Sequence, residues 1–173
     1  MNETMKTILT RRSIRRFTDR PIPDEVLQDL AAAAMHAPSG KNLKTWKFTV
    51  VTNQALIAQL AEALRVQLGR ESYDMYRPVA LLIPSNLRNS AFGPEDDACA
   101  LQNVFLAAHA HGVGSVWINQ LRGLCDEPAI RALLRELHIP ENHVVYGLAA
   151  LGYADPTAPV TPYKEAGEVE YIH

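Results

Sequence analysis

The sequence of 173 residues has few cysteines and no strong excess of either charge. Its two cysteines, Cys99 and Cys125, are too few for a disulfide framework, so we expect a reducing compartment, the cytoplasm. With 17 Lys and Arg against 19 Asp and Glu, the chain lacks the basic excess of a typical nucleic-acid-binding protein. The first residues hold no apolar core of signal-peptide length, which argues against secretion.

Common motifs of phosphate, dinucleotide and metal sites are also missing. There is no GxxxxGK[ST] loop, and GVGSVW (112–117) lacks the third glycine and the strand-before, helix-after context of a dinucleotide fingerprint. No HExxH or paired CxxC occurs, and His109 and His111 are poorly spaced to share one helix face, so we expect no metal site. No catalytic nucleophile or base stands out. This favours an enzyme whose bound cofactor performs the reaction.

Charge is absent from 24 consecutive residues, 98–121. The run is long enough to suggest a membrane span, but amide and imidazole side chains and two glycines interrupt it, so we interpret it as a buried helix and a buried strand. The expected helix, 94–111, has little polar surface beyond Gln102, Asn103 and His109. One side must pack on a sheet and the other needs a second cover, so we predict a homodimer. A helix enclosed within one subunit is the alternative.

The hydrophobic pattern predicts alternating helices and strands in one domain, residues 1–153. This order is typical of an α+β or α/β fold with a sheet of four or five strands. Residues 154–173 lack a strong period, and we expect an extended arm that ends in a strand-like segment, 169–172. Helices are expected at 2–11, from Asp24 to before Pro38, at 54–67, 94–111 and 127–137, and strands at 47–51, 79–83, 115–119 and 144–153, the last broken by Gly147 and Gly152.

The positive charge is unevenly placed. Residues 1–86 carry 12 basic and 8 acidic side chains, a net charge of +4, and the remainder carry 5 and 11, a net charge of −6. The excess is concentrated in RRSIRRF (11–17), where guanidinium groups and the Ser13 hydroxyl suit a phosphate. If this segment is extended, Arg11, Ser13 and Arg15 face the same way. A solvated charge run is the alternative, because short arginine runs are common.

Four segments, in order along the chain, resemble motifs of the nitroreductase-like flavoproteins. The resemblance implies an α+β fold with a central mixed or antiparallel sheet surrounded by helices. It also implies an intertwined homodimer that exchanges its C-terminal arms and binds FMN at the subunit interface. The four segments are RRSIRRF (11–17), HAPSGKNLKTWKF (36–48), DACALQNVFLAAHAHGVGSVWI (97–118) and IPENHVVYGLAALGYAD (139–155).

The resemblance also implies which residues bind the cofactor. The arginine segment would contact the FMN phosphate, the ribityl chain and the pyrimidine edge of the ring. The loop that follows the second helix would come from the other subunit, and backbone after the 115–119 strand would pass the flavin N5 and O4. The implied residues are Arg11, Arg12, Ser13 and Arg15; Pro38, Ser39 and Asn42; Ile118, Asn119 and Gln120; and Lys164 on the phosphate.

Three departures from the family pattern affect the expected site. Lys44-Thr45-Trp46 stands where many members have Gln-Pro-Trp, and Lys164 stands alone where the family has a basic pair. Only ten residues, 84–93, separate a predicted strand from the long helix, so we expect an open pocket without a large lid. Arg70 and Tyr73 occupy a variable stretch that sometimes touches the ring.

The resemblance implies an FMN-dependent oxidoreductase that takes electrons from NADH or NADPH. It would pass them by a ping-pong scheme to a small conjugated acceptor such as a nitroaromatic or a quinone. Other flavin chemistry on the same fold, reductive dehalogenation or flavin fragmentation, is one alternative. A non-catalytic flavin- or nucleotide-binding protein is another. We expect neither a nucleic acid nor a membrane as a partner.

Overall fold

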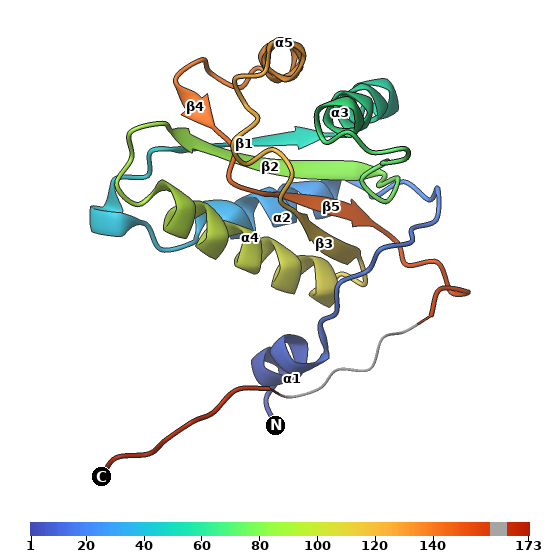
Figure 1. Cartoon of the computed structure of the whole chain (residues 1–173). Helices are drawn as coiled ribbons and strands as arrows, with labels where there is room; N and C mark the ends of the chain where they lie inside the picture. The colour runs from blue at the N-terminus through green and yellow to red at the C-terminus, as the bar shows by residue number, and fades with distance from the viewer. Residues whose placement is uncertain (160–165) are drawn as a thin grey trace.

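The computed structural model describes residues 1–159 and 166–173, and its regular elements lie within 3–152. The described strands form one sheet in which every pair is antiparallel, and helices cover it (Figure 1), as the α+β prediction required. The helices are α1 (Glu3–Thr10), α2 (Asp24–Met35), the short 3-10 helix η1 (Gly40–Asn42), α3 (Gln54–Gln67), α4 (Gly93–Ala110) and α5 (Pro128–Glu136). The strands are β1 (Trp46–Val51), β2 (Ala80–Leu87), β3 (Gly114–Ile118), β4 (His143–Val144) and β5 (Leu148–Gly152).

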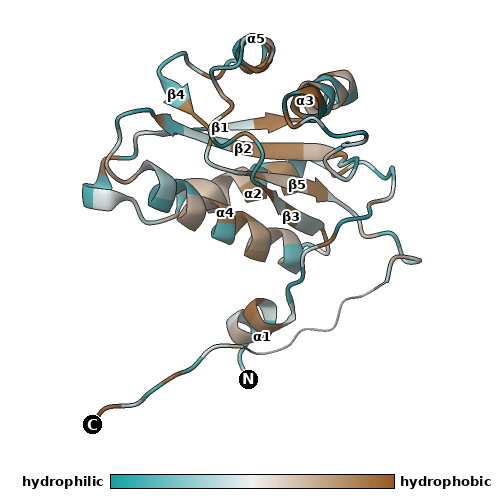
Figure 2. Cartoon of the chain, viewed as in Figure 1, coloured by the Kyte–Doolittle hydropathy of each residue, from teal (hydrophilic) through white to brown (hydrophobic). Residues whose placement is uncertain are grey.

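The strands are ordered β1–β2–β5–β3, and β4 pairs with β2. Helices α2 and α4 cover one face of the sheet, and α3 and α5 cover the other (Figure 1). Successive residues of β2 alternate between two cores: Leu81 and Ile83 pack towards α3 and α5, and Ala80 and Leu82 pack towards α2 and α4. Because both faces are covered, β5 and the first half of β2 (80–83) are continuous apolar runs, whereas Lys47 and Thr49 interrupt β1 (Figure 2).

Two of the predicted strands differ from the observed bounds by more than one residue. β2 continues past Ile83 to Leu87, because its pairing with β1 extends through Pro84. The pairing with β5 ends at Leu82, before the proline, so the missing N–H interrupts no ladder on that side. The predicted strand 144–153 is divided into β4 and β5. The division falls at Gly147, where an added Cβ would lie 2.3 Å from the Trp117 ring.

The predicted strand-like segment 169–172 was wrong. Residues 166–173 form no strand, and the side chains of Val169, Tyr171 and Ile172 are at least three-quarters exposed. A strand requires a neighbouring strand to satisfy its backbone, and nothing in the described part of this chain lies alongside these residues as one.

Apolar surface remains uncovered on two helices. α1 has no buried residue, and Met5, Ile8 and Leu9 are each more than two-fifths exposed. α4 packs on α2 and on the sheet, while its outer side presents exposed Cys99 and Gln102 without a formal charge. Across the described residues, no helix combines the length and the hydropathy needed to cross a membrane.

Candidate functional site

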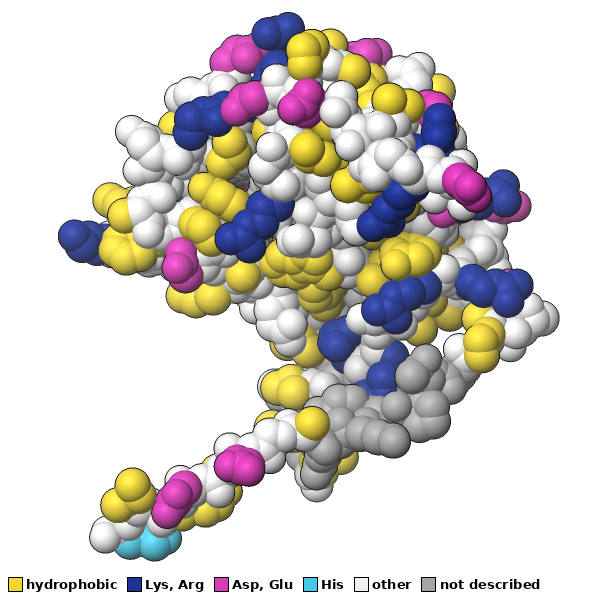
Figure 3. Space-filling view, viewed as in Figure 1, with side chains coloured by type: hydrophobic (Ala, Val, Ile, Leu, Met, Phe, Trp, Pro, Cys, Tyr) yellow, Lys and Arg dark blue, Asp and Glu magenta, His cyan; other side chains and the backbone are white. Residues whose placement is uncertain are grey.

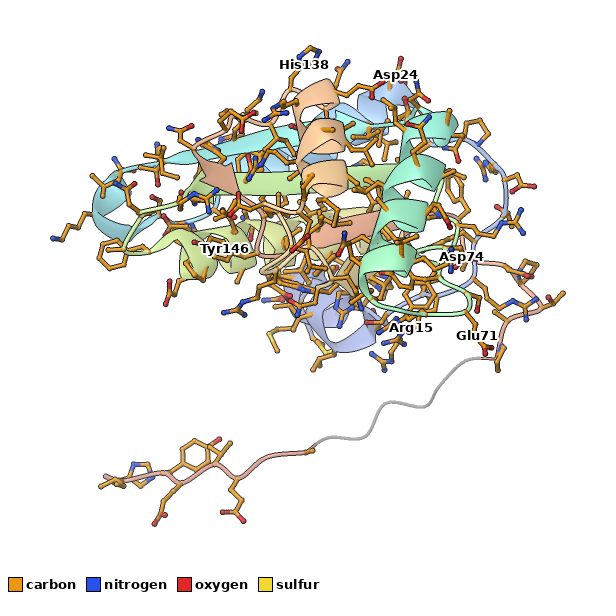
Figure 4. The ribbon with its side chains drawn as sticks, turned by 45° about the horizontal axis from the view of Figure 1, so that its top comes forward. Arg15, Asp24, Glu71, Asp74, His138 and Tyr146 are labelled. Atoms are coloured by element: carbon orange, nitrogen blue, oxygen red, sulfur yellow. The ribbon has the colours of Figure 1, made fainter. Side chains whose placement is uncertain are left out.

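The arginine segment follows α1 and lies against the edge strand of the sheet. Ser13 forms a parallel bridge with Ser115 of β3, and the Ile14 N–H donates to the Ser115 carbonyl at 3.0 Å. The predicted extended conformation is therefore present at this bridge. In Figure 4, Arg15 lies beside α1, at the side of the molecule opposite His138.

Two facing glycines give this segment its seat. Gly114 of β3 and Gly152 of β5 are register partners. An added Cβ at Gly114 would lie 2.9 Å from the Ile14 side chain, and one at Gly152 would lie 2.8 Å from the Phe17 ring. Ile14 and Phe17 thus occupy the space that two missing side chains leave, and they anchor the backbone between the arginines.

The basic side chains of this region fall into two groups. Some are occupied: Arg16 pairs with Asp155 at 3.2 Å, and Arg12 Nη1 donates to the carbonyls of Leu9 and Arg11 at the end of α1. By contrast, Arg11, Ser13 and Arg15 form no side-chain hydrogen bond or ion pair with the residues that the structure describes. Figure 3 shows Lys and Arg side chains gathered beside the segment that follows α1. Two guanidinium groups and a hydroxyl are thus available for an anion.

His109 of α4 joins this end of the helix to α1. Its Nε2 lies 2.8 Å from the Thr10 hydroxyl, one residue before the arginine segment. Burial, and then the charges of Arg11 and Arg12, lower the pKa of the His109 imidazole. The lowered pKa favours the neutral imidazole, and the hydrogen bond between His109 and Thr10 connects α4 with α1.

The backbone after β3 carries the other predicted contacts of this end. The Ile118 side chain is buried, so only its main chain could face a ligand. The Asn119 N–H is bonded to Oε1 of Gln120 at 3.0 Å, and the Asn119 side chain accepts from Nε1 of Trp117 at 3.3 Å. Trp117 itself is 37% exposed, which leaves an aromatic surface next to this turn.

The loop that holds the remaining predicted contacts lies at the other end of α4. Pro38 and Asn42 are exposed and Ser39 is half-buried. The loop is unusual in its backbone, because Lys41, Asn42 and Lys44 have positive φ angles of 52°, 56° and 50°. Non-glycine residues in this conformation are strained and need support from their surroundings.

Buried polar groups support this loop. The Gly40 N–H and the Ser39 hydroxyl donate to the two carboxylate oxygens of Asp96, at 2.7 and 3.1 Å. The Thr45 hydroxyl donates to Asn86 Oδ1 at 2.6 Å, and Asn86 Nδ2 donates to Asp97 Oδ1 at 2.9 Å.

Asp97 ends this chain of hydrogen bonds with an unusual environment. It is fully buried, and its Oδ2 has no hydrogen-bond partner among the described residues. The pKa of the Asp97 carboxyl is raised to about 7, mainly by burial, which outweighs the opposing hydrogen bond from Asn86, and with a smaller contribution from the neighbouring Asp96. The carboxyl is therefore poised to hold a proton near neutral pH.

The structure brings the predicted contacts together in two groups. Asp96, in the first turn of α4, is bonded to the 38–42 loop. His109, in the last turn of α4, is bonded to Thr10, the last residue of α1. These two α4 residues are thirteen positions apart, which is about 20 Å along a helix at 1.5 Å per residue. Within one chain, the arginine segment and the 38–42 loop therefore lie near opposite ends of α4.

Three further residues that the sequence suggested as ligand contacts, Lys164, Arg70 and Tyr73, lie outside these two groups. Lys164 lies outside the described residues. The guanidinium of Arg70 stacks on the Tyr73 ring, 5.1 Å from its centroid, and burial raises the pKa of the Tyr73 hydroxyl to about 12. Whether either residue touches a ligand stays a prediction.

Sequence reasoning missed the polar groups that support the loop. Asp96 and Asp97 lie in the first turn of the helix predicted at 94–111, and Asn86 lies beyond the end of the strand predicted at 79–83. Three acidic residues in a row (95–97), where one suffices to favour a helix N-terminus, were the available signal.

Similarity to proteins of known sequence agrees with this geometry. A protein from Archaeoglobus fulgidus whose name pairs NADH dehydrogenase with NAD(P)H nitroreductase is 35% identical over 155 residues, which is 88% of this chain and 86% of that relative. An NADPH-flavin oxidoreductase from Vibrio harveyi is 31% identical, and the match covers 94% of this chain and 70% of the relative.

Similarity to solved structures extends over the whole chain. A nitroreductase with bound FMN from Bacteroides fragilis has a TM-score of 0.95 at 37% identity, and all of both chains is covered. The model of the Nitroreductase family matches residues 8–78 and 75–153, which include the arginine segment, the loop and both ends of α4. With this match across most of its length, the chain belongs to the nitroreductase family.

Proposed function

We propose that this chain is an FMN-dependent oxidoreductase that takes electrons from NADH or NADPH and passes them to a small conjugated acceptor, such as a nitroaromatic or a quinone. When bound, FMN supplies the redox chemistry, taking up a hydride and later returning the electrons. The observation that carries the proposal is the set of Arg11, Ser13 and Arg15, whose polar groups have no partner among the described residues. Their chemistry fits the phosphate of FMN.

The other residues of the chain would bind and orient the cofactor. The backbone of Ile118, Asn119 and Gln120 would pass the edge of the flavin ring, and the Asn119 N–H would become a donor there once the Gln120 side chain releases it. Pro38, Ser39 and Asn42 would line the same flavin from the other subunit, because within one chain they lie at the far end of α4 from the arginines. Lys164 would add a cation to the phosphate.

A homodimer follows from this division of the site. The uncovered apolar side chains of α1 and the uncharged outer side of α4 supply the surface for it. We propose that residues 154–173 form an arm that packs on the partner subunit. The exposed Val169, Tyr171 and Ile172 would be its apolar anchors.

The substrate side of the site is expected to be open. Only residues 88–92 connect β2 to α4, which is too short for a covering lid. The chain's own residues would therefore orient the flavin and leave one ring face accessible in turn to the nicotinamide and to the acceptor. Both cysteines are free thiols, which is consistent with work in the cytoplasm.

The proposal is tested by spectroscopy on the purified protein. We expect the flavin absorbance of FMN, loss of that absorbance on anaerobic addition of NADH or NADPH, and its return on addition of a nitroaromatic or a quinone. Bound flavin that neither nicotinamide reduces would point to a binding protein instead. Sedimentation should give a dimer, and an FMN-loaded monomer would contradict the shared site.

A further inference from the structure

The carboxylate of Asp96 makes two hydrogen bonds to neighbouring residues of the 38–46 loop. The Gly40 N–H donates to Oδ1 at 2.7 Å, and the Ser39 hydroxyl donates to Oδ2 at 3.1 Å. Asp96 is only 4% exposed, and it lies in the first turn of α4, so it connects the loop to a rigid element. Both oxygens of this carboxylate are thus committed to the loop.

The hydrogen bonds of Ser39 leave it a restricted role towards any ligand. A serine hydroxyl has one proton and two lone pairs, and a carboxylate oxygen can only accept. The Ser39 proton is therefore directed at Asp96, while the Lys44 N–H occupies one lone pair of Ser39 Oγ at 2.9 Å. What remains is a single lone pair. Ser39 can accept a hydrogen bond from a ligand, and it has no proton to donate.

The backbone of the loop makes this support necessary. Lys41, Asn42 and Lys44 all have positive φ angles, each of which costs on the order of 1 kcal/mol for a non-glycine residue. Such a conformation persists only where the surroundings fix it. Asp96 fixes the loop on both sides of the strained residues, directly at Gly40 and through Ser39 at the Lys44 N–H.

We propose that Asp96 is a positioning residue of the flavin site, which holds the 39–44 loop and makes Ser39 an acceptor-only contact. Ser39 would then meet a hydrogen-bond donor of FMN, which means a ribityl hydroxyl or the ring N3–H. This inference rests on the proposed function, in which Ser39 lines the flavin of the other subunit. Asp96 itself touches no cofactor and acts through Ser39 and Gly40.

Two substitutions of Asp96 separate its two effects. D96A removes both acceptors and releases the loop. D96N keeps the shape, and its amide oxygen can still accept from the Gly40 N–H. The amide NH2 then faces Ser39, so the Ser39 hydroxyl must accept from it and turn its proton towards the ligand. D96N thereby converts Ser39 from an acceptor into a donor. E95Q is the matched control, since it removes a charge from the same helix turn at an exposed side chain.

The first measurement is amide hydrogen exchange on the FMN-free protein. We expect D96A to speed exchange at Gly40 and Lys44 by at least about tenfold, and D96N and E95Q to leave Gly40 protected. Unchanged protection at both amides in D96A would overturn the positioning role. This readout needs no flavin, so it remains decisive if wild-type protein fails to bind FMN and the proposed function is lost.

The second measurement is FMN affinity by fluorescence titration. We expect D96N to weaken binding about tenfold and S39A about threefold to tenfold, with E95Q within about twofold of wild type. In the D96N background, S39A should cause no further loss, because the accepting lone pair is already lost. Independent, multiplying effects of S39A and D96N would show that Asp96 does not act through Ser39. This pair stays informative if D96A does not fold.

Discussion

The two ends of α4 treat their polar groups in opposite ways. At the N-terminal end, Asp96 accepts from the loop, and hydrogen bonds connect Thr45 to Asn86 and Asn86 to Asp97. At the C-terminal end, Arg11 and Arg15 extend from the segment after α1 without a partner in the described part of the chain. At the N-terminal end most of these polar groups are bonded within the subunit, with Asp97 Oδ2 as an exception, whereas the cations at the other end would need an outside anion.

The two ends of α4 would have different roles in a flavin site that is shared between two copies of the chain. In the proposed site, binding energy for the cofactor would be concentrated at the unpaired cations, because a bound phosphate would gain charge-assisted hydrogen bonds there. Shape is concentrated where hydrogen bonds are internally satisfied, because that loop has to present its contacts in a fixed conformation. In a homodimer, the shaped end of one subunit would face the charged end of the other.

The largest effect is expected from removing the unpaired cations that would bind the phosphate of FMN. We expect replacement of Arg11 and Arg15 by Ala together to weaken FMN binding at least about a hundredfold, on the order of 3 kcal/mol, because both charge-assisted contacts are lost. Fluorescence titration measures the change. Arg16→Ala is the control, since Arg16 is already paired with Asp155. A double variant with wild-type affinity would refute the phosphate site.

At the N-terminal end of α4, the charge of Asp97 depends on pH near neutrality. The pKa of Asp97 is raised to about 7 in the folded chain, whereas an unfolded Asp titrates near 3.9. Between these values the unfolded chain has lost a proton that the folded chain keeps. The free energy of unfolding therefore falls as pH rises from about 4 to 7, and it levels off above that.

Asp97→Asn removes this pH dependence. Relative to wild type, we expect the variant to gain about 2–3 kcal/mol in free energy of unfolding when the pH is raised from 5 to 8. Chemical denaturation at both pH values measures the gain. Asp126→Asn is a suitable control, because hydrogen bonding to Arg88 lowers the pKa of Asp126 and its titration is complete below pH 5. If the difference in free energy of unfolding between the variant and wild type is the same at pH 5 and pH 8, the raised pKa of Asp97 is contradicted.

The loop can also be disturbed through its packing. An added Cβ at Gly40 would lie 2.2 Å from the Phe92 ring, so we expect Gly40→Ala to lower the free energy of unfolding by about 1–3 kcal/mol. Phe92→Ala should relieve the collision, and the double variant should cost less than the sum of the two single changes. Additive costs, measured by chemical denaturation, would show that the ring does not hold the loop.

The smallest expected effect is a change in FMN affinity when Gln120, which follows β3, is replaced. Gln120 Oε1 occupies the Asn119 N–H, which removes a donor from the proposed flavin edge. Gln120→Ala should free that N–H and tighten FMN binding by about twofold to threefold, since one neutral hydrogen bond contributes about 0.5–1.5 kcal/mol. Weaker binding in the same titration would assign the Gln120 side chain itself to the cofactor.

Local patterns in the sequence predicted most of the helices. The bounds of α3 agree with the predicted 54–67, because its apolar spacing is regular and the Asn53 side chain caps its first turn by accepting from the Ala55 and Leu56 N–H groups. α4 ends at Ala110, one residue before the predicted 111, and Gly112 follows it with a φ of 70°. Signals of this kind lie within a few residues of the feature that they define.

Features that depend on distant pairing were not predictable. β2 contains Pro84, Ser85 and Asn86, which have low strand propensity, and its pairing with β1, and with β4 at Asn86, keeps them in the sheet. The bond between Ser39 and Asp96 joins residues 57 positions apart, so no local pattern announces it. The arginine segment was the reverse case: its composition indicated the phosphate chemistry, but its seat on β3 required the fold.

The pair of glycines under the arginine segment has a consequence for adjusting the enzyme. Gly114 and Gly152 never need to approach the flavin, yet the depth at which Ile14 and Phe17 sit against them fixes where the guanidinium groups point. Substitutions at Gly114 or Gly152 would therefore change the affinity for the cofactor by shifting the arginine segment that packs on them. An engineer who wants a looser or tighter holoenzyme has there a control that leaves every ligand-contacting side chain as it is.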